Sequence, residues 1–207
     1  IVVNGQTAIS GGNFHGQPLA MALDYATLAA SEIGNISDRR IYLALEGGHG
    51  LPKLLMKDTG INSGYMILQY TSAALASENK SLCFPASADS IPTSLGQEDH
   101  VSMGSISGRK ALQVISNVEK ILAIELLTAA QAFEFRKPLK SGILLDKIHQ
   151  FVRKKVPFAA KDRVFADDIS VAVQCIRSGH IIDLVQQVMD AEKMQWDSPH
   201  HEEFDTL

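Results

Sequence analysis

The stretch that most constrains the fold runs from Arg109 to Arg136, 28 residues without a glycine or a proline. As a helix it would be about 42 Å long at 1.5 Å per residue. Its apolar residues recur every three or four positions and form an arc wider than the stripe of a surface helix. One face comprises Leu112, Ile115, Val118, Leu122, Leu126 and Ala129, and Ile121, Ile124 and Leu127 widen it. The sequence therefore predicts one long helix, uninterrupted at Asn117 and covered on at least two sides in its assembled state.

Glycines, prolines and capping residues divide the rest of the chain into further helices. The expected helices are 17–34, begun by Gln17-Pro18 and ended by Gly34; 37–47, capped by Ser37-Asp38; 62–81; 142–155; and 167–193, capped by Asp167 or Asp168. Residues 85–97 contain two prolines and a glycine and are expected to form a loop. No alternating strand pattern of five or more residues occurs. We predict an all-α, long-helix bundle over residues 1–197, followed by a tail at 198–207.

Composition excludes several classes of function. The chain has 207 residues, 45% of them hydrophobic, and a net charge of −4. Its longest basic block is Arg153-Lys154-Lys155, so neither a nucleic-acid surface nor a polybasic membrane patch is expected. Apolar runs are too short for a membrane-spanning helix, which needs roughly 20 residues. Cys83 and Cys175 show neither metal-ligand spacing nor a disulfide framework, which predicts a reducing, cytoplasmic location.

Two short stretches combine glycines with the side chains that polar sites use. The first is Gly11-Gly-Asn-Phe-His-Gly16, just before a predicted helix, where glycines allow a tight turn and bring Phe14 and His15 close to a ligand. The second is Gln97-Glu-Asp-His-Val-Ser-Met-Gly104, where carboxylates stand beside an imidazole and could orient a substrate or transfer protons.

Each stretch also has a simpler interpretation. Gly11–Gly16 could be an irregular entry to a helix, with Phe14 filling a hole. Glu98 and Asp99 could complement the positive end of a helix dipole. The spacing of His15, His49 and His100 does not suit a metal site, so no metal is expected.

Further along the chain, several motifs occur in a fixed order with the two stretches above. They are Ile61-Asn-Ser-Gly64, Ala76-Ser-Glu-Asn-Lys80, Pro85-Ala-Ser-Ala-Asp-Ser90, Pro92-Thr-Ser94 and Ala123-Ile-Glu-Leu-Leu127. Together they resemble the histidine, phenylalanine and tyrosine ammonia-lyase family over nearly all of residues 5–190. The chain is most similar to the C-terminal portion of the histidine enzymes. Ile1 in place of a methionine likewise predicts a start inside a longer polypeptide.

The resemblance implies a helical assembly of the aspartase/fumarase type, a homotetramer with each active site built by three subunits. It implies elimination of ammonia from L-histidine to give trans-urocanate, with a methylidene-imidazolone electrophile that forms from an internal Ala-Ser-Gly. This chain contains no Ala-Ser-Gly. The electrophile is therefore expected in a missing N-terminal portion, and the chain alone is expected to be inactive.

The resemblance also implies roles for individual residues. Glu98 faces the substrate ring as the catalytic-site carboxylate, Phe14 and Gln97 line the substrate pocket, and Asn13, His15 and His100 support them. A carboxylate can accept a charge-assisted hydrogen bond from an imidazole N–H, whereas a phenyl ring offers no donor. Because a phenol hydroxyl can also donate, a tyrosine ammonia-lyase or an aminomutase stays open, as does a non-catalytic helical assembly module. Phe14 and Glu98 are not expected to form a complete site within one subunit.

Overall fold

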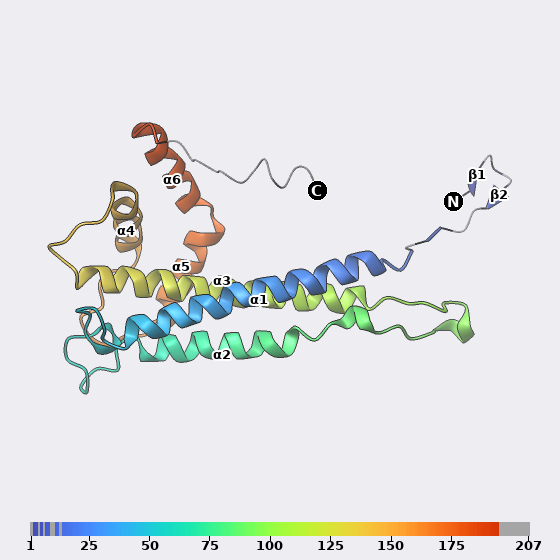
Figure 1. The fold of residues 1–207 in the computed structure, drawn as a ribbon, viewed down its shortest axis with the longest axis horizontal. Coiled ribbons are helices and arrows are strands. Elements are labelled where there is room, and N and C mark those ends of the chain that lie inside the picture. Colours follow the sequence, from blue (N-terminus) through green and yellow to red (C-terminus); the bar gives the residue numbers. More distant parts are fainter. Residues whose placement is uncertain (1, 4, 6, 9–10, 13, 195–207) are drawn as a thin grey trace.

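Three long helices lie side by side and form the body of the protein (Figure 1). The structure is a computed structural model that describes residues 2–3, 5, 7–8, 11–12 and 14–194. The long helices are α1 (Gln17–Leu45), α2 (Met66–Leu82) and α3 (Gly104–Glu134). Three shorter helices gather at one end of the body: α4 (Ile143–Lys155), α5 (Ala166–Arg177) and α6 (His180–Ala191). The predicted all-α class is confirmed.

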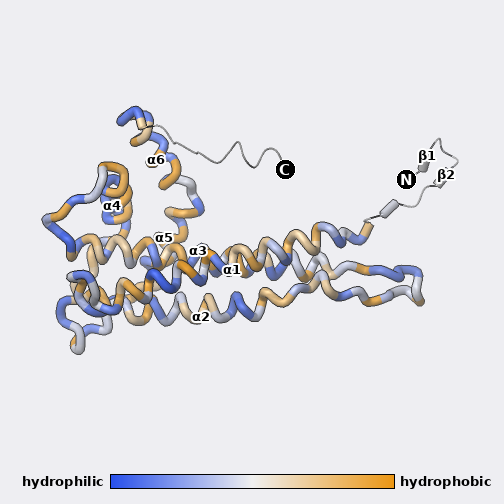
Figure 2. The backbone as a smooth tube through the Cα atoms, in the orientation of Figure 1, coloured by the Kyte–Doolittle hydropathy of each residue, from blue (hydrophilic) through white to orange (hydrophobic). Residues whose placement is uncertain are grey.

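The described strands are very short. Strands β1 (Val2–Val3) and β2 (Thr7–Ala8) pair antiparallel ahead of α1. Figure 2 shows polar and apolar segments alternating along the long helices, as expected for helices that bury one face. No helix in the described residues is long and apolar enough to cross a bilayer. The predicted tail at 198–207 lies outside the described residues.

Helix α3 forms the predicted uninterrupted helix and starts earlier than expected, at Gly104. It contacts α1, α2 and α5, and Val114, Ile121 and Ile124 on it are fully buried. Leu112, in contrast, is 71% exposed in this chain. The width of the apolar arc is thus only partly explained by contacts within the chain.

The predicted helix end at Gly34 is wrong, because α1 continues through it to Leu45. A Cβ atom at Gly34 would lie 3.2 Å from Val118 Cγ2 and 3.3 Å from Ile121 Cδ1. The glycine therefore permits α1 and α3 to approach closely. Ser37 and Asp38, predicted to cap a second helix, are 1% exposed inside α1.

The predicted helix 167–193 is also wrong, since it is two helices separated at Ser178-Gly179. Gly179 has a φ of 74°, a left-handed conformation that glycine adopts without a steric penalty and that commonly ends helices. Asp167 and Asp168 do lie in the first turn of α5, where carboxylates complement the helix dipole.

The hydrophobic core is richest at the end of the body where α4 and α5 pack, and a polar network lies inside it. Gln131 is fully buried and donates from Nε2 to the carbonyl groups of Leu55 (3.3 Å) and Ala159 (2.8 Å). Its Oε1 accepts from the Ala159 N–H and from Arg153. Burial raises the pKa of the neighbouring Tyr65 hydroxyl to about 12. At this end of the molecule, Gln131 therefore connects α3 with α4 and with two buried loop segments.

Candidate functional site

The two glycine-containing motifs meet at the opposite end of the body. One leads into α1 and the other into α3, and the two helices begin side by side (Figure 1). The Ser102 hydroxyl donates a hydrogen bond to the His15 carbonyl oxygen, which ties the motifs together. A Cβ atom at Gly104 would lie 3.6 Å from Ala20 Cβ, so the start of α3 lies against the first turn of α1. The structure thus brings together segments that are 87 residues apart in the sequence.

Gly16 shapes the entry into α1. Its φ of 73° is left-handed, and its carbonyl accepts the Ala20 N–H at 3.0 Å. Pro18 follows in the first turn, where its missing N–H leaves no helical hydrogen bond unmade. The Phe14 ring, just before this turn, is 90% exposed and contacts the His15 ring edge-on, with 5.3 Å between centroids.

Glu98 lies on a hairpin-like loop that extends beyond the ends of the helices, between α2 and α3 (Figure 1). Isolated antiparallel bridges join Ser90 to Ser102 at its base and Thr93 to Glu98 near its tip. The Thr93 N–H donates to the Glu98 carbonyl at 3.0 Å. Within the part of the chain that the structure describes, Glu98 takes part in no salt bridge. Glu98 is half-buried, and its Oε2 accepts a long hydrogen bond from the Thr93 hydroxyl at 3.5 Å, which leaves Oε1 able to accept from a ligand.

The tip of this loop is strained. Ser94, Leu95 and Gly96 have φ values of 52°, 59° and 88°, and the first two are not glycines. For the two non-glycine residues such conformations cost on the order of 1–3 kcal/mol each, and they are common near functional sites. Gln97, directly after the tip, is exposed and donates its N–H to the Ser94 carbonyl at 3.1 Å.

His100 is oriented by Ser90, whose hydroxyl lies 2.8 Å from His100 Nδ1. The same oxygen accepts the Val101 N–H at 3.1 Å, so the hydroxyl hydrogen is free to point at the imidazole. Both side chains are exposed. Asn13, predicted to support the site, lies outside the described residues.

A buried polar cluster beneath the loop was missed by sequence reasoning. Asp24 is 4% exposed, accepts the Ser87 N–H at 2.7 Å and lies 3.6 Å from Lys110 Nζ. Burial raises the pKa of the Asp24 carboxyl group, but hydrogen bonds from Ser87 and the charge of Lys110 outweigh burial and hold it below its usual value. The sequence does place an aspartate and a lysine on two separate helices. Their contact becomes apparent only when the packing of α1 against α3 is known.

The motif Ile61-Asn-Ser-Gly64 also has a clear structural role. Asp162 accepts hydrogen bonds from the N–H groups of Ser63 (2.7 Å) and Gly64 (2.8 Å), just before α2. A Cβ atom at Gly64 would lie 2.5 Å from the Leu54 carbonyl oxygen. This motif therefore joins the start of α2 to a distant loop and contributes no group to the exposed end.

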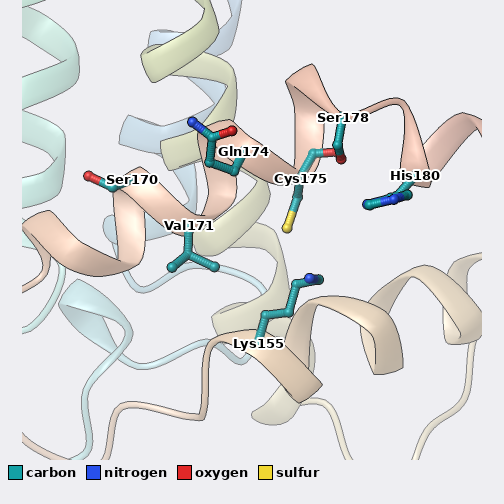
Figure 3. Close-up of a pocket in the computed structure, with 7 residues that line it drawn as sticks. All are labelled: Lys155, Ser170, Val171, Gln174, Cys175, Ser178 and His180. Carbon is teal, nitrogen blue, oxygen red and sulfur yellow. The ribbon is translucent and has the colours of Figure 1, made fainter.

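A pocket with a mostly apolar lining lies far from the motifs, among α4, α5 and α6 (Figure 3). It measures about 320 Å³ and is lined by Lys155, Ser170, Val171, Gln174, Cys175, Ser178 and His180. The Cys175 sulfur points into it toward Lys155. Burial raises the pKa of the Cys175 thiol despite the opposing charge of Lys155, so the thiol is not activated as a nucleophile. Among the described residues, no group of three or more histidine, cysteine, aspartate or glutamate side chains could hold a metal ion.

Known proteins match most of the chain. The aromatic amino acid lyase family model matches residues 1–154. The histidine ammonia-lyase of Natranaerobius thermophilus is 51% identical over 183 residues, covering 87% of this chain and 36% of the relative. That of Caldanaerobacter subterraneus subsp. tengcongensis is 53% identical over 180 residues, covering 86% of this chain and 35% of the relative. The chain thus spans about a third of the length of these relatives.

A solved structure shows the same fold. The crystal structure of histidine ammonia-lyase from Trypanosoma cruzi superposes with a TM-score of 0.84 at 47% identity, covering 89% of this chain and 37% of that one. Tyrosine aminomutase from Streptomyces globisporus superposes equally well, with a TM-score of 0.84 at 36% identity over 90% of this chain and 36% of that one. The chain therefore belongs to the aromatic amino acid lyase family.

Proposed function

We propose that this chain is part of a histidine ammonia-lyase and contributes Glu98 and Phe14 to its substrate pocket. The observation that carries the proposal is the placement of Glu98. Its carboxylate stands on a loop that extends beyond the helices, at the same end as Phe14, and forms no salt bridge within the described residues. The two curated relatives above carry the name histidine ammonia-lyase, which supports this substrate.

Glu98 would bind the imidazole ring of histidine by accepting its N–H. A hydrogen bond to a charged group contributes about 1.5–3 kcal/mol, more than a neutral one. The Phe14 side chain, which is 90% exposed in this chain, would cover the imidazole ring of the substrate with an apolar surface. Gln97 and His100, on the same loop as Glu98, would contribute further polar contacts.

The electrophile of the reaction would come from residues outside this chain. The family's methylidene-imidazolone forms from Ala-Ser-Gly, and this sequence contains no such tripeptide. The residues present therefore do not build the group, and the part of the chemistry that they supply is substrate binding. The C-terminal placement of the chain within the enzyme stays a prediction.

Other copies of the chain would complete the site in a homotetramer. The supporting observation is apolar surface on α1, which includes Leu19 (70% exposed), Tyr25 (77%) and Leu43 (62%). Apolar side chains this exposed along one helix are typical of a contact surface. Cys83 and Cys175 are free thiols, in keeping with the cytoplasmic location that we propose.

A tyrosine-specific lyase or aminomutase is the second candidate, favoured by the superposition on tyrosine aminomutase. The test is to supply histidine and tyrosine separately to the full-length enzyme that contains this chain, and to identify the products. We expect an acrylate and free ammonia from histidine. Formation of a β-amino acid from tyrosine would show that the enzyme is an aminomutase. If neither amino acid is turned over, the interpretation as a non-catalytic assembly module is favoured.

A further inference from the structure

A buried ion pair lies beneath the base of the Glu98 loop. Lys110 on α3 and Asp24 on α1 are 3.6 Å apart, and their side chains are 15% and 5% exposed. Two charges this deeply buried contribute little net stability, because desolvation offsets much of their attraction. A gain in stability therefore does not explain why the two charges are buried together. The other hydrogen bonds that Asp24 and Lys110 make indicate a different role.

Those contacts hold the backbone that leads from α2 to the loop. Asp24 Oδ2 accepts the Ser87 N–H at 2.7 Å, and Gln17 Nε2 donates to the Ser87 carbonyl at 2.8 Å. Lys110 Nζ donates to the Phe84 carbonyl. Both backbone polar groups of Ser87 are thus fixed by side chains of α1, while α3 holds the preceding turn.

The loop starts three residues after Ser87. Its first strand-like residue, Ser90, pairs with Ser102, which is itself tied to the His15 carbonyl. Nearer the tip, Thr93 pairs with Glu98. Since the loop extends away from the helices, the direction in which Glu98 points depends on how firmly these two ends of the loop are held.

We propose that Asp24 and Lys110 are positioning residues that set the orientation of Glu98 by fixing the Phe84–Ser87 segment. The expected effect on substrate choice rests on the proposed function. The expected effect on the rigidity of the loop rests only on the contacts described above, and hydrogen exchange measures it separately.

The key variant replaces the pair by apolar residues, Asp24→Leu with Lys110→Met. Replacing a buried ion pair by apolar side chains of similar volume is often neutral or stabilising, so the fold is expected to persist. The Ser87 N–H and the Phe84 carbonyl nevertheless lose their partners. Lys110→Arg, which keeps the charge and the donor, is the conservative variant. Glu119→Gln removes an exposed ion pair with Arg177 (2.5 Å) elsewhere on α3 and is the matched control.

The first measurement is amide hydrogen exchange on the 207-residue chain. We expect the double variant to exchange about tenfold faster at Ser87 and also at Thr93 and Val101, whose N–H groups hold the loop together. Lys110→Arg and Glu119→Gln should exchange like the wild type at these amides. If the exchange rate rises only at the Ser87 amide, the ion pair does not hold the loop in place and the proposal is wrong.

The second measurement is kcat/KM for histidine and phenylalanine in the full-length enzyme that contains this chain. The double variant should lose about tenfold of its preference for histidine, equivalent to about 1.4 kcal/mol, because a displaced Glu98 no longer meets the imidazole. If the pair were purely structural, the double variant would lower kcat/KM equally for histidine and phenylalanine. That result would overturn the proposal. If Glu98→Gln itself leaves the preference unchanged, the proposed function fails, while the exchange data still judge the positioning of the loop.

Discussion

The two ends of the helical body differ in what their polar groups do. At the end covered by α4 and α5, the fully buried Gln131 makes five hydrogen bonds, which join α3 to α4 and to the loops before α2 and α5. At the motif end, Phe14, Gln97 and His100 are exposed, and hydrogen bonds from both backbone groups and serine side chains hold the two motif loops. The difference indicates that polar groups at the first end serve the fold of this chain, whereas those at the second are available to other molecules.

The largest effect is expected at the buried end, from Gln131→Leu. The substitution leaves the carbonyl groups of Leu55 and Ala159 and the Ala159 N–H without partners in a dry interior. Each such group costs about 1–3 kcal/mol, so the free energy of unfolding should fall by about 3–5 kcal/mol. Urea denaturation measures it. Gln97→Leu at the exposed end is the control and should change stability by no more than about 0.5 kcal/mol; equal losses would remove the contrast between the ends.

The next effect concerns function and belongs to the exposed end. Glu98→Gln keeps the shape of the side chain and removes its charge. In the full-length enzyme, kcat/KM for histidine should fall about 10- to 150-fold, equivalent to about 1.5–3 kcal/mol, while that for phenylalanine should hold or rise. Stability should barely change, because Glu98 is half-buried and forms no salt bridge within the described residues. An equal fall for both substrates would assign Glu98 a structural or general catalytic role.

A smaller effect separates two glycines on neighbouring helices. Gly34→Ala places a methyl group 3.2 Å from Val118 Cγ2, and overpacking of this kind costs about 1–3 kcal/mol. Gly108→Ala, inside α3, meets only Leu23 Cδ1 at 3.8 Å and should stabilise the helix by about 0.5–1 kcal/mol. Thermal unfolding of both variants tests this. If the unfolding temperatures of both variants shift in the same direction and by similar amounts, Gly34 is not a position of close contact between helices.

These glycines also show why the sequence predicts only part of the fold. The uninterrupted helix predicted over residues 109–136 follows from local composition, and the structure confirms it from residue 109 to Glu134. Gly34 and Gly179 look alike in the sequence, yet the first lies at a helix contact and the second ends a helix with a φ of 74°. Only the position of the neighbouring helix distinguishes them.

The candidate site shows the same limit. Its residue types and glycines are visible in the sequence, and so is its division into two motifs. The hydrogen bond from Ser102 to the His15 carbonyl and the Asp24–Lys110 pair depend on how α1 and α3 pack. Periodicity indicates which residues face inward, but it does not indicate which of them meet.

The smallest effect is a difference in pH dependence between the wild type and Glu134→Gln, at the buried end. Glu134 lies 2.6 Å from Lys137, 3.1 Å from His149 and 3.4 Å from Arg153. Burial raises its pKa, but the hydrogen bond and charge of Lys137, with the charges of Arg153 and of His149 when it is protonated, outweigh burial and hold the pKa below its usual value. A depressed carboxyl pKa contributes stability that is present above the unfolded-state pKa and is lost as the pH falls through the folded-state pKa.

His149 also contributes to the loss of stability on acidification. Burial, helped by Arg153 and Lys137, lowers its pKa, and Glu134 opposes this shift, so the contribution of His149 remains in Glu134→Gln and is not reduced by the substitution. The test is therefore denaturation below about pH 5, where the Glu134 carboxyl group titrates, and there Glu134→Gln should show a shallower loss of stability than the wild type. Gln97→Leu, at the exposed end, removes no titratable group and should follow the wild-type curve. If Glu134→Gln follows that curve as well, ionisation of the carboxylate at the buried end is not coupled to the stability of the fold.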